Sequence, residues 1–350
     1  MNAIIREDLN TISYQLVNNI EELRDCNLFI SGGTGFIGKW LVHSLLYLND
    51  SYNLNLKVEV LSRNPKKFID SYPDFSQNDA LSFIQGDVRD FEFNSVSYSS
   101  YQYVIHAATE ADAYLNVDNP MLMSDVIVNG TKHMLDFAAA TNAHKFLFLS
   151  SGAVYGEQPF TIDSLDEEYL GAPLTIEQGG AYAHSKRLAE FFCSHYSRKY
   201  GFYSIIARCF AFIGPYLPLE AHYAIGNFIN NGLMHKNITI KSDGKPLRTY
   251  MYATDMVVML IKLLTICNET SIFNVGSKNV VSIKEVADLV AGYFSNVEVE
   301  VLNQKRIIDR NYNYIPNVKK VEELLGPTSM VSLNDSIGRT IKFYEGRIYE

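Results

Sequence analysis

The stretch NLFISGGTGFIGKW, residues 27–40, decides how the rest of the chain is interpreted. Residues 27–31 form a short apolar run that predicts a buried β-strand, and a helical pattern continues beyond the glycines to about residue 48. Gly32, Gly35 and Gly38 lie between the two with the spacing G-x-x-G-x-x-G.

Glycines at such a strand-to-helix turn permit a tight bend, close approach of the backbone to a pyrophosphate and close packing of the helix on the strand. The helix N-terminus adds N–H donors and a partial positive charge, which favour an anion. The stretch therefore predicts a binding site for a dinucleotide. The residues that we expect to contact it are Gly32, Thr34, Gly35, Phe36 and Ile37.

Strands and helices alternate after this turn. Short apolar runs at 57–61, 81–84, 103–105 and 145–149 predict further strands, and a long helical pattern covers about 119–142. This alternation is typical of an α/β fold with a doubly wound parallel sheet of the Rossmann type.

The second half of the chain is less regular. A helix over 181–200 and a strand over 203–207 come before an irregular, aromatic-rich region at 211–249, and the α/β alternation then resumes. Helical spacing of apolar residues in 7–24 predicts an amphipathic helix ahead of the main fold. We therefore expect three parts: an N-terminal helical extension (1–25), a Rossmann domain (26–208 plus about 250–277), and a smaller, interleaved α/β domain that binds the substrate (209–249 plus 278–350).

Composition excludes several classes of function. The 350 residues carry a net charge of −9 and contain no basic tract, which argues against nucleic acid as a partner. No apolar run is long enough for a membrane span, and the first residues lack a signal-peptide core, so a cytoplasmic protein is expected. The four cysteines are widely spaced in apolar surroundings and indicate buried free thiols. The eight histidines show no metal-binding spacing, so no metal is expected.

The ends of the predicted strands carry further cofactor candidates. The second strand ends at Ser62 and Arg63, where a carboxylate would bind the ribose of NAD. These two residues could instead accept a 2′-phosphate, which favours NADP; NAD, with Arg63 in solvent, is the alternative. Asp87 after the third strand is a candidate for hydrogen bonding to adenine, or a simple turn residue. The neighbouring candidates are Val88, Ala107 and Ala108.

Tyr182 and Lys186 lie four residues apart at the start of a predicted helix, and therefore on one face of it. A neighbouring ammonium and a positive nicotinamide would favour the phenolate, so Tyr182 is a candidate acid or base for a sugar hydroxyl. Ser151, at the end of the fifth strand, could hydrogen-bond the same oxygen.

The sequence resembles the extended short-chain dehydrogenase/reductases, in the NAD(P)-dependent nucleotide-sugar epimerase/dehydratase group. The resemblance covers about residues 26–280 and rests on motifs in family order. These are GGTGFIG (32–38), GDV (86–88), HAA (106–108), NGT (129–131), SSGAVYG (150–156), YAHSK (182–186), the segment from Arg208 to Pro215, RTYMYATD (248–255) and FNVGS (273–277).

The resemblance implies a catalytic set of Ser151, Tyr182 and Lys186, with Lys186 also holding the cofactor ribose. It implies a nucleotide-diphosphate sugar as substrate, and a homodimer that pairs the helices at 119–142 and 181–200. The substrate contacts that it suggests are Thr109, Ser151, Asn227, Arg248 and Arg310.

The chain also departs from the family at informative positions. Gly152 and Ala153 stand where 4,6-dehydratases have Asp-Glu and where sugar-acid decarboxylases have a glutamate, which counts against both activities. Ala211 replaces a common substrate-binding asparagine. We favour an epimerase acting through a transient keto-sugar at C4, with an NADPH-dependent 4-keto-6-deoxy-sugar reductase as the alternative. A 4,6-dehydratase and a non-catalytic dinucleotide sensor are less favoured.

Overall fold

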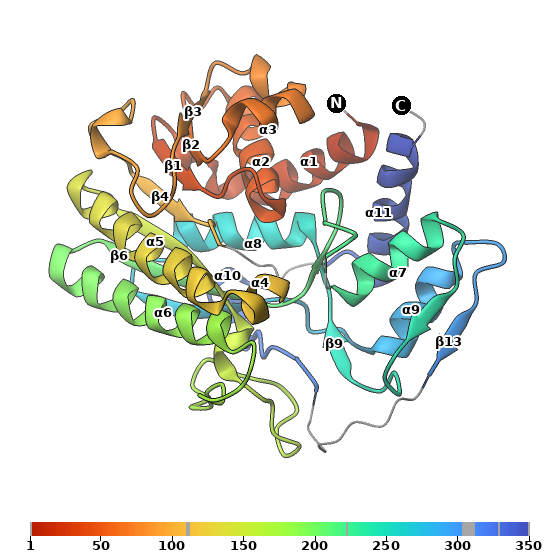
Figure 1. Cartoon of the computed structure of the whole chain (residues 1–350). Coiled ribbons are helices and arrows are strands. Elements are labelled where there is room, and N and C mark those ends of the chain that lie inside the picture. The colour runs from red at the N-terminus through yellow and green to blue at the C-terminus, as the bar shows by residue number, and fades with distance from the viewer. Residues whose placement is uncertain (1, 110–112, 222, 303–311, 328–329, 349–350) are drawn as a thin grey trace.

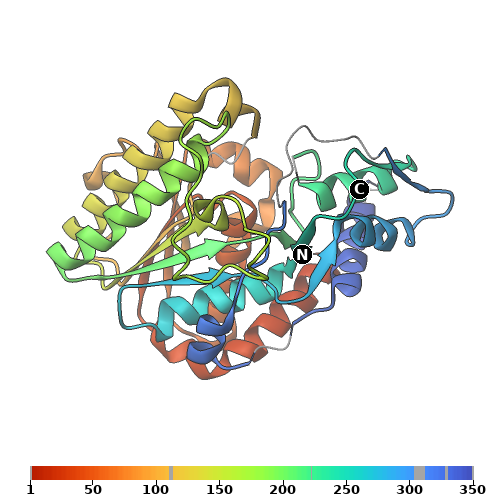
Figure 2. The same ribbon diagram turned by 90° about the horizontal axis from the view of Figure 1, so that it is seen from below.

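A computed structural model describes residues 2–109, 113–221, 223–302, 312–327 and 330–348. The chain folds into a large part built on a parallel sheet and a smaller part beside it, shown in Figure 1 and, from below, in Figure 2.

The large part is organised by a seven-stranded sheet in the order β11-β6-β5-β4-β1-β2-β3, in which every pair of neighbours is parallel. The strand order reverses between β1 and β4, and ligands of such sheets bind beyond the carboxyl ends of the strands at this point. The bounds are β1 Asn27–Ser31, β2 Lys57–Ser62, β3 Leu81–Gln85, β4 Tyr103–His106, β5 Lys145–Ser151, β6 Tyr203–Cys209 and β11 Ser271–Val275.

Helices cover both faces of the sheet, so its strands are apolar on both sides. Leu28 and Ile30 of β1 pack into a core with α1 (Ala3–Leu16), α2 (Phe36–Tyr52) and α8 (Ala253–Ile266). The residue between them, Phe29, faces the opposite core, which includes α5 (Pro120–Ala140) and α6 (Ala181–Tyr200). The two long helices lie side by side in both views.

The N-terminal extension is a helix followed by a 3-10 segment, η1 (Val17–Leu23), where the sequence predicted one helix over 7–24. Its apolar face is buried against α8, and its polar Asp8 is also buried. The Asp8 carboxylate accepts hydrogen bonds from the Tyr252 hydroxyl (2.7 Å) and from Arg339 (2.6 Å) of α11 (Leu333–Ile348). These bonds tie the two ends of the chain to the start of α8.

The smaller part contains three two-stranded sheets and its own apolar core. Its elements are β7 Phe212–Ile213, α7 Ala224–Leu233, β8 Ile238–Ile240, β9 Leu247–Thr249, β10 Met251–Tyr252, β12 Val280–Ser282, α9 Ile283–Ala291 and β13 Val299–Val301, together with α11. The short helix α10 (Lys319–Leu325) instead packs on β11 and α8 of the large part. The fold class is therefore confirmed, whereas the domain boundaries predicted at 25, 208, 249 and 277 stay a prediction.

Shorter elements complete the described chain. Asn64 caps α3 (Pro65–Ser71) by accepting from the Lys67 N–H at 3.0 Å. The others are η2 Pro73–Gln77, η3 Phe93–Ser95, α4 Ala113–Asp118 and η4 Gly152–Tyr155.

All four cysteines are free thiols in buried positions, as the sequence predicted. Within the described residues, no helix combines the length and the apolar character needed to cross a membrane.

Candidate active site

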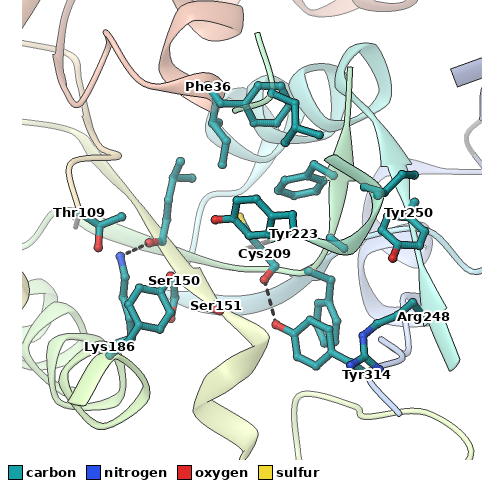
Figure 3. Close-up of a pocket in the computed structure, with 18 of the residues that line it drawn as sticks. Phe36, Thr109, Ser150, Ser151, Lys186, Cys209, Tyr223, Arg248, Tyr250 and Tyr314 are labelled. Carbon is teal, nitrogen blue, oxygen red and sulfur yellow. Dashed lines mark hydrogen bonds between the residues drawn. The ribbon is translucent and has the colours of Figure 1, made fainter. Parts of the chain in front are cut away.

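Two adjoining cavities lie at the carboxyl ends of the parallel strands. The glycine-loop cavity, of about 200 Å³, is lined by the turn after β1 and by the ends of β2 and β3. The tyrosine cavity, of about 520 Å³, lies between the sheet and the smaller part and contains Ser151, Tyr182 and Lys186 (Figure 3). Ala107 and Thr109, just after β4, line both cavities, so a ligand that fills one reaches the other.

The backbone of the glycine loop leaves no room for side chains. A Cβ on Gly32, whose φ is +76°, would lie 2.4 Å from the Ala108 nitrogen, and one on Gly38 would lie 2.1 Å from the Gly32 oxygen. Gly35 has no side chain with which to cap α2, so the N–H groups of its first turn are the natural donors for an anionic ligand. This turn fits the pyrophosphate that the sequence predicted.

The predicted cofactor residues come together around these cavities. Phe36, Ile37, Tyr182 and Lys186 line the tyrosine cavity. Those that line the glycine-loop cavity are Gly32, Thr34, Gly35, Ser62, Arg63, Asp87, Val88, Ala107 and Ala108.

Charged side chains gather near the ends of β2 and β3, where the glycine-loop cavity contains Arg63 and Asp87. Arg89 donates to both Asp87 oxygens, at 2.8 and 3.0 Å, and also bonds Asp125 at 2.7 Å. The hydrogen bonds from Arg89 hold the pKa of Asp87 below its usual range. Arg89 is thus shared by Asp87 and Asp125, and Ser62 and Arg63 line the same cavity as Asp87.

The candidate catalytic residues come from adjacent elements. Ser151 ends β5, and Tyr182 and Lys186 lie in the first turns of α6. Buried Lys186 donates from Nζ to the Leu149 carbonyl at 2.7 Å, and its Nζ lies 5.8 Å from the centroid of the Tyr182 ring. Burial lowers the pKa of Lys186 to about 8.

Burial dominates the electrostatics of Tyr182. It raises the pKa of the phenol, and this effect outweighs the hydrogen bond with the Ser151 hydroxyl, which lowers it. The expectation that Lys186 and a positive nicotinamide together favour the phenolate stays a prediction. The phenol is protonated near neutral pH, and its ionisation requires additional positive charge from a ligand in the site.

Further aromatic residues, which the sequence did not mark as site residues, also line the tyrosine cavity. They include Phe210 and Tyr223, Tyr250 and Tyr314, which are labelled in Figure 3. The Tyr314 hydroxyl hydrogen-bonds Ser151 and lies 3.4 Å from the Cys209 carbonyl oxygen. Tyr314 belongs to the C-terminal region, and a β-bridge to Arg248 places it at the tyrosine cavity. No local sequence motif marks this position, so the sequence alone did not indicate it.

The structure shows a steric reason for glycine, and not an acidic residue, at position 152. A Cβ at this position would lie 2.6 Å from the Tyr314 hydroxyl oxygen and 2.7 Å from Cζ of Phe210. Two aromatic side chains therefore occupy the space next to position 152, so an acid there would displace them.

Only some of the predicted substrate-binding residues line the tyrosine cavity in the described structure. Thr109, Ser151 and Arg248 line the tyrosine cavity, and Arg248 also donates to the Leu247 carbonyl at 2.8 Å and to that of Tyr312. Asn227 is exposed and is not among the residues that line the tyrosine cavity. With its amide oxygen and nitrogen exchanged, the nitrogen donates to the carbonyl oxygens of Leu219 (3.0 Å) and Ala221 (2.9 Å). Arg310 lies outside the described residues. The role of each in substrate binding stays a prediction.

The His, Cys, Asp and Glu side chains of the described residues form no group of three or more that could hold a metal ion.

Comparison with known proteins identifies the family. The model of the NAD dependent epimerase/dehydratase family matches residues 28–276. The chain belongs to this family, which confirms the resemblance predicted from the motifs.

Individual relatives are similar over nearly the whole chain. UDP-glucuronic acid decarboxylase 3 of Arabidopsis thaliana is 29% identical over 317 residues, covering 89% of this chain and 86% of its own. A putative UDP-glucose 4-epimerase of Methanocaldococcus jannaschii is 26% identical and is covered over 97% of its length, with 90% of this chain aligned. The structure of UDP-glucuronic acid 4-epimerase from Bacillus cereus, in complex with UDP-glucuronic acid and NAD, superimposes with a TM-score of 0.77. It shares 21% identity, covers 92% of this chain and 99% of its own, and supports the fold.

Proposed function

We propose that the protein is an NAD(P)-dependent nucleotide-sugar epimerase that acts at C4 through a transient keto-sugar. The observation that carries this proposal is the junction of the two cavities: Ser151, Tyr182 and Lys186 stand next to Ala107 and Thr109, where a dinucleotide in one cavity would meet a sugar in the other.

The dinucleotide, when bound, supplies a nicotinamide that accepts and returns a hydride. Tyr182 would take the proton from the C4 hydroxyl as the hydride leaves C4, and would return that proton to the same oxygen when the hydride is delivered to the opposite face of C4. Lys186, held by the Leu149 carbonyl, stabilises the ionised phenol and holds the cofactor ribose. Ser151 hydrogen-bonds the substrate oxygen. Because burial alone keeps Tyr182 neutral, oxidation depends on the positive charge that the oxidised cofactor brings.

The neighbourhood of Ser151 argues against the other reactions of the family. Dehydration and sugar-acid decarboxylation use acids at the positions of Gly152 and Ala153. Here the side chains of Tyr314 and Phe210 fill the space beside Gly152, so no nearby carboxylate can replace the missing acids from that side. The similarity to a decarboxylase therefore fits a shared scaffold better than a shared reaction.

The nucleotide sugar would extend from Ser151 toward the smaller part. Arg248 lines that side of the tyrosine cavity and would contact the diphosphate, together with Arg310 and Asn227 as further candidates. Tyr223 and Tyr250 would add apolar contacts.

NADP is the favoured cofactor and NAD the alternative. Ser62 ends β2 and Arg63 follows it, and both line the glycine-loop cavity. Asp87, which lines the same cavity, is paired with Arg89. Arg63 would supply the positive charge that a 2′-phosphate needs. The same feature favours the second candidate function, an NADPH-dependent reductase of nucleotide 4-keto-6-deoxy-sugars.

We also propose a homodimer that pairs α5 and α6 with the same helices of a second copy. Apolar side chains on the two helices are exposed: Met121 at 77%, Phe191 at 59% and Leu188 at 43%. Helical faces of this kind are covered in assemblies. A mass near 40 kDa by light scattering would contradict the dimer.

The experiment that tests the function begins by denaturing the purified protein and identifying the released dinucleotide. The protein is then incubated with UDP-, dTDP-, CDP- and GDP-sugars, and epimerised product is scored separately from NADPH consumption. Epimer formation without net cofactor consumption supports the epimerase. Stoichiometric NADPH loss with a 4-keto-sugar would instead establish the reductase, and Tyr182→Phe with unchanged turnover would contradict catalysis at this site.

A further inference from the structure

Helix α6 carries Tyr182 in its first turn but has no cap of its own. Gly180 occupies the N-cap position and provides no side chain. Its backbone is in the right-handed helical region (φ −78°, ψ −10°), whereas a capping side chain works from an extended conformation. A Cβ there would also lie 3.1 Å from the Glu177 carbonyl oxygen. An acceptor for the first-turn N–H groups must therefore come from elsewhere.

Asn116 of α4 supplies that acceptor. Its Oδ1 accepts a hydrogen bond from the Tyr182 backbone N–H at 2.9 Å, and its Nδ2 donates to the Gly179 carbonyl. The first bond is the one that an N-cap side chain makes to the second residue of a helix, and here it comes from a residue 66 positions earlier. In Figure 1, α4 lies beside the start of α6.

Asn116 connects this cap to the site itself. It lines the tyrosine cavity together with Thr109, which precedes it along the chain at the end of β4. Its amide oxygen accepts from α6 and its amide nitrogen donates to the turn before α6, so the side chain fixes the start of the helix that carries Tyr182.

We propose that Asn116 is a positioning residue for Tyr182, capping α6 from a separate helix and fixing the phenol against Ser151 and Lys186. This inference rests on the proposed catalytic role of Tyr182. Displacement of a reacting group by about 1 Å can lower a rate on the order of 100-fold. Loss of the cap at Tyr182 is therefore expected to lower kcat.

The place of residue 116 beside the start of α6 also explains why it is an asparagine and not an aspartate. Asparagine and aspartate cap helices about equally well. A carboxylate at Asn116 would place a negative charge at the helix end where the Tyr182 phenol must ionise, and would oppose the partial positive charge of that end. The neutral amide caps the helix without this effect on the phenol.

The test compares Asn116→Ala and Asn116→Asp with a matched control, Asn119→Ala. Asn119 caps the neighbouring helix α5 through the Leu122 N–H at 3.2 Å and does not contact α6 in the described hydrogen bonds. For each holoenzyme, kcat, KM, the pH profile of kcat and the thermal unfolding midpoint are measured with the best nucleotide sugar found in the screen above. Tyr182→Phe is measured in parallel.

We expect the two alanine variants to lose similar stability, a few degrees in the unfolding midpoint. Only Asn116→Ala should lose kcat, by about 10- to 100-fold, with little change in KM. Asn116→Asp keeps the acceptor for the Tyr182 N–H but cannot donate to the Gly179 carbonyl, so its midpoint should also fall. In addition, the limb of its kcat profile that rises with pH should move to higher pH by a few tenths of a unit.

Equal kcat in the two alanine variants, or an unshifted profile in Asn116→Asp, would overturn the inference while leaving the proposed function intact if Tyr182→Phe is inactive. Full activity of Tyr182→Phe would overturn both.

Discussion

Replacing Lys186 by methionine should stabilise the fold while abolishing turnover. The Lys186 ammonium is 1% exposed, and burial lowers its pKa from 10.5 to about 8. At neutral pH the folded state must therefore hold a charge that it disfavours by about 3 kcal/mol, at 1.36 kcal/mol per pKa unit. Methionine fills a similar volume but loses the hydrogen bond to the Leu149 carbonyl, so we expect a net gain of about 1–3 kcal/mol.

The pH dependence of the free energy of unfolding tests independently whether the Lys186 charge destabilises the fold. A lysine whose folded pKa lies below its unfolded value destabilises the fold most below the folded pKa, near 8. The penalty decreases as pH rises toward the unfolded value, to about 2 kcal/mol at pH 9. The advantage of Lys186→Met over wild type should therefore shrink between pH 7 and pH 9.

The assay is urea unfolding without added nucleotide, followed by circular dichroism, at both pH values. Lys145→Met is the matched control, because Lys145 is also buried with a lowered pKa and donates to the Thr265 carbonyl at 2.8 Å, but begins β5 at the end away from the site. It should keep wild-type turnover. A Lys186→Met protein that is less stable than wild type at pH 7, or whose advantage grows with pH, would refute the reasoning.

Three further substitutions test the two cavities and the buried start of α8. Gly38→Ala places a Cβ 2.1 Å from a carbonyl oxygen of the glycine loop and should abolish dinucleotide retention in a released-cofactor assay, whereas Gly292→Ala, with 3.4 Å of room, should retain it. Gly152→Ala should lower kcat at least about 10-fold by displacing the Tyr314 hydroxyl, and wild-type kcat would contradict that packing. Burial raises the pKa of Asp255 to about 6, so wild type should lose about 2 kcal/mol relative to Asp255→Asn as pH rises from 4 to 7. Unfolding midpoints that run parallel across this range would rule out that titration.

The features that the sequence predicts well are those encoded locally. The turn at 32–38 combines strand, glycines and helix within a dozen residues, and Tyr182 and Lys186 are placed by helical periodicity alone. Strand ends such as Ser151 follow because parallel strands present their carboxyl ends at one edge of the sheet.

Other features depend on contacts between distant segments. Tyr314 reaches Ser151 from a region without a motif, through a bridge to Arg248. Asn116 lies 66 positions from the N–H that it caps. The pKa of Tyr182 is likewise raised by burial that its local sequence does not reveal. Such effects arise from packing and have no sequence period to mark them.

The central claim is that a hydride leaves C4 of a nucleotide sugar and returns to the same carbon. The most direct test uses the nucleotide sugar found active in the screen, deuterated at C4, in ordinary water, with the product examined by NMR and mass spectrometry. The proposed mechanism predicts an inverted C4 that retains its deuterium, with no net change in the bound cofactor and no product from Tyr182→Phe. Loss of deuterium to solvent, or its transfer into free NADPH or NADH, would contradict it.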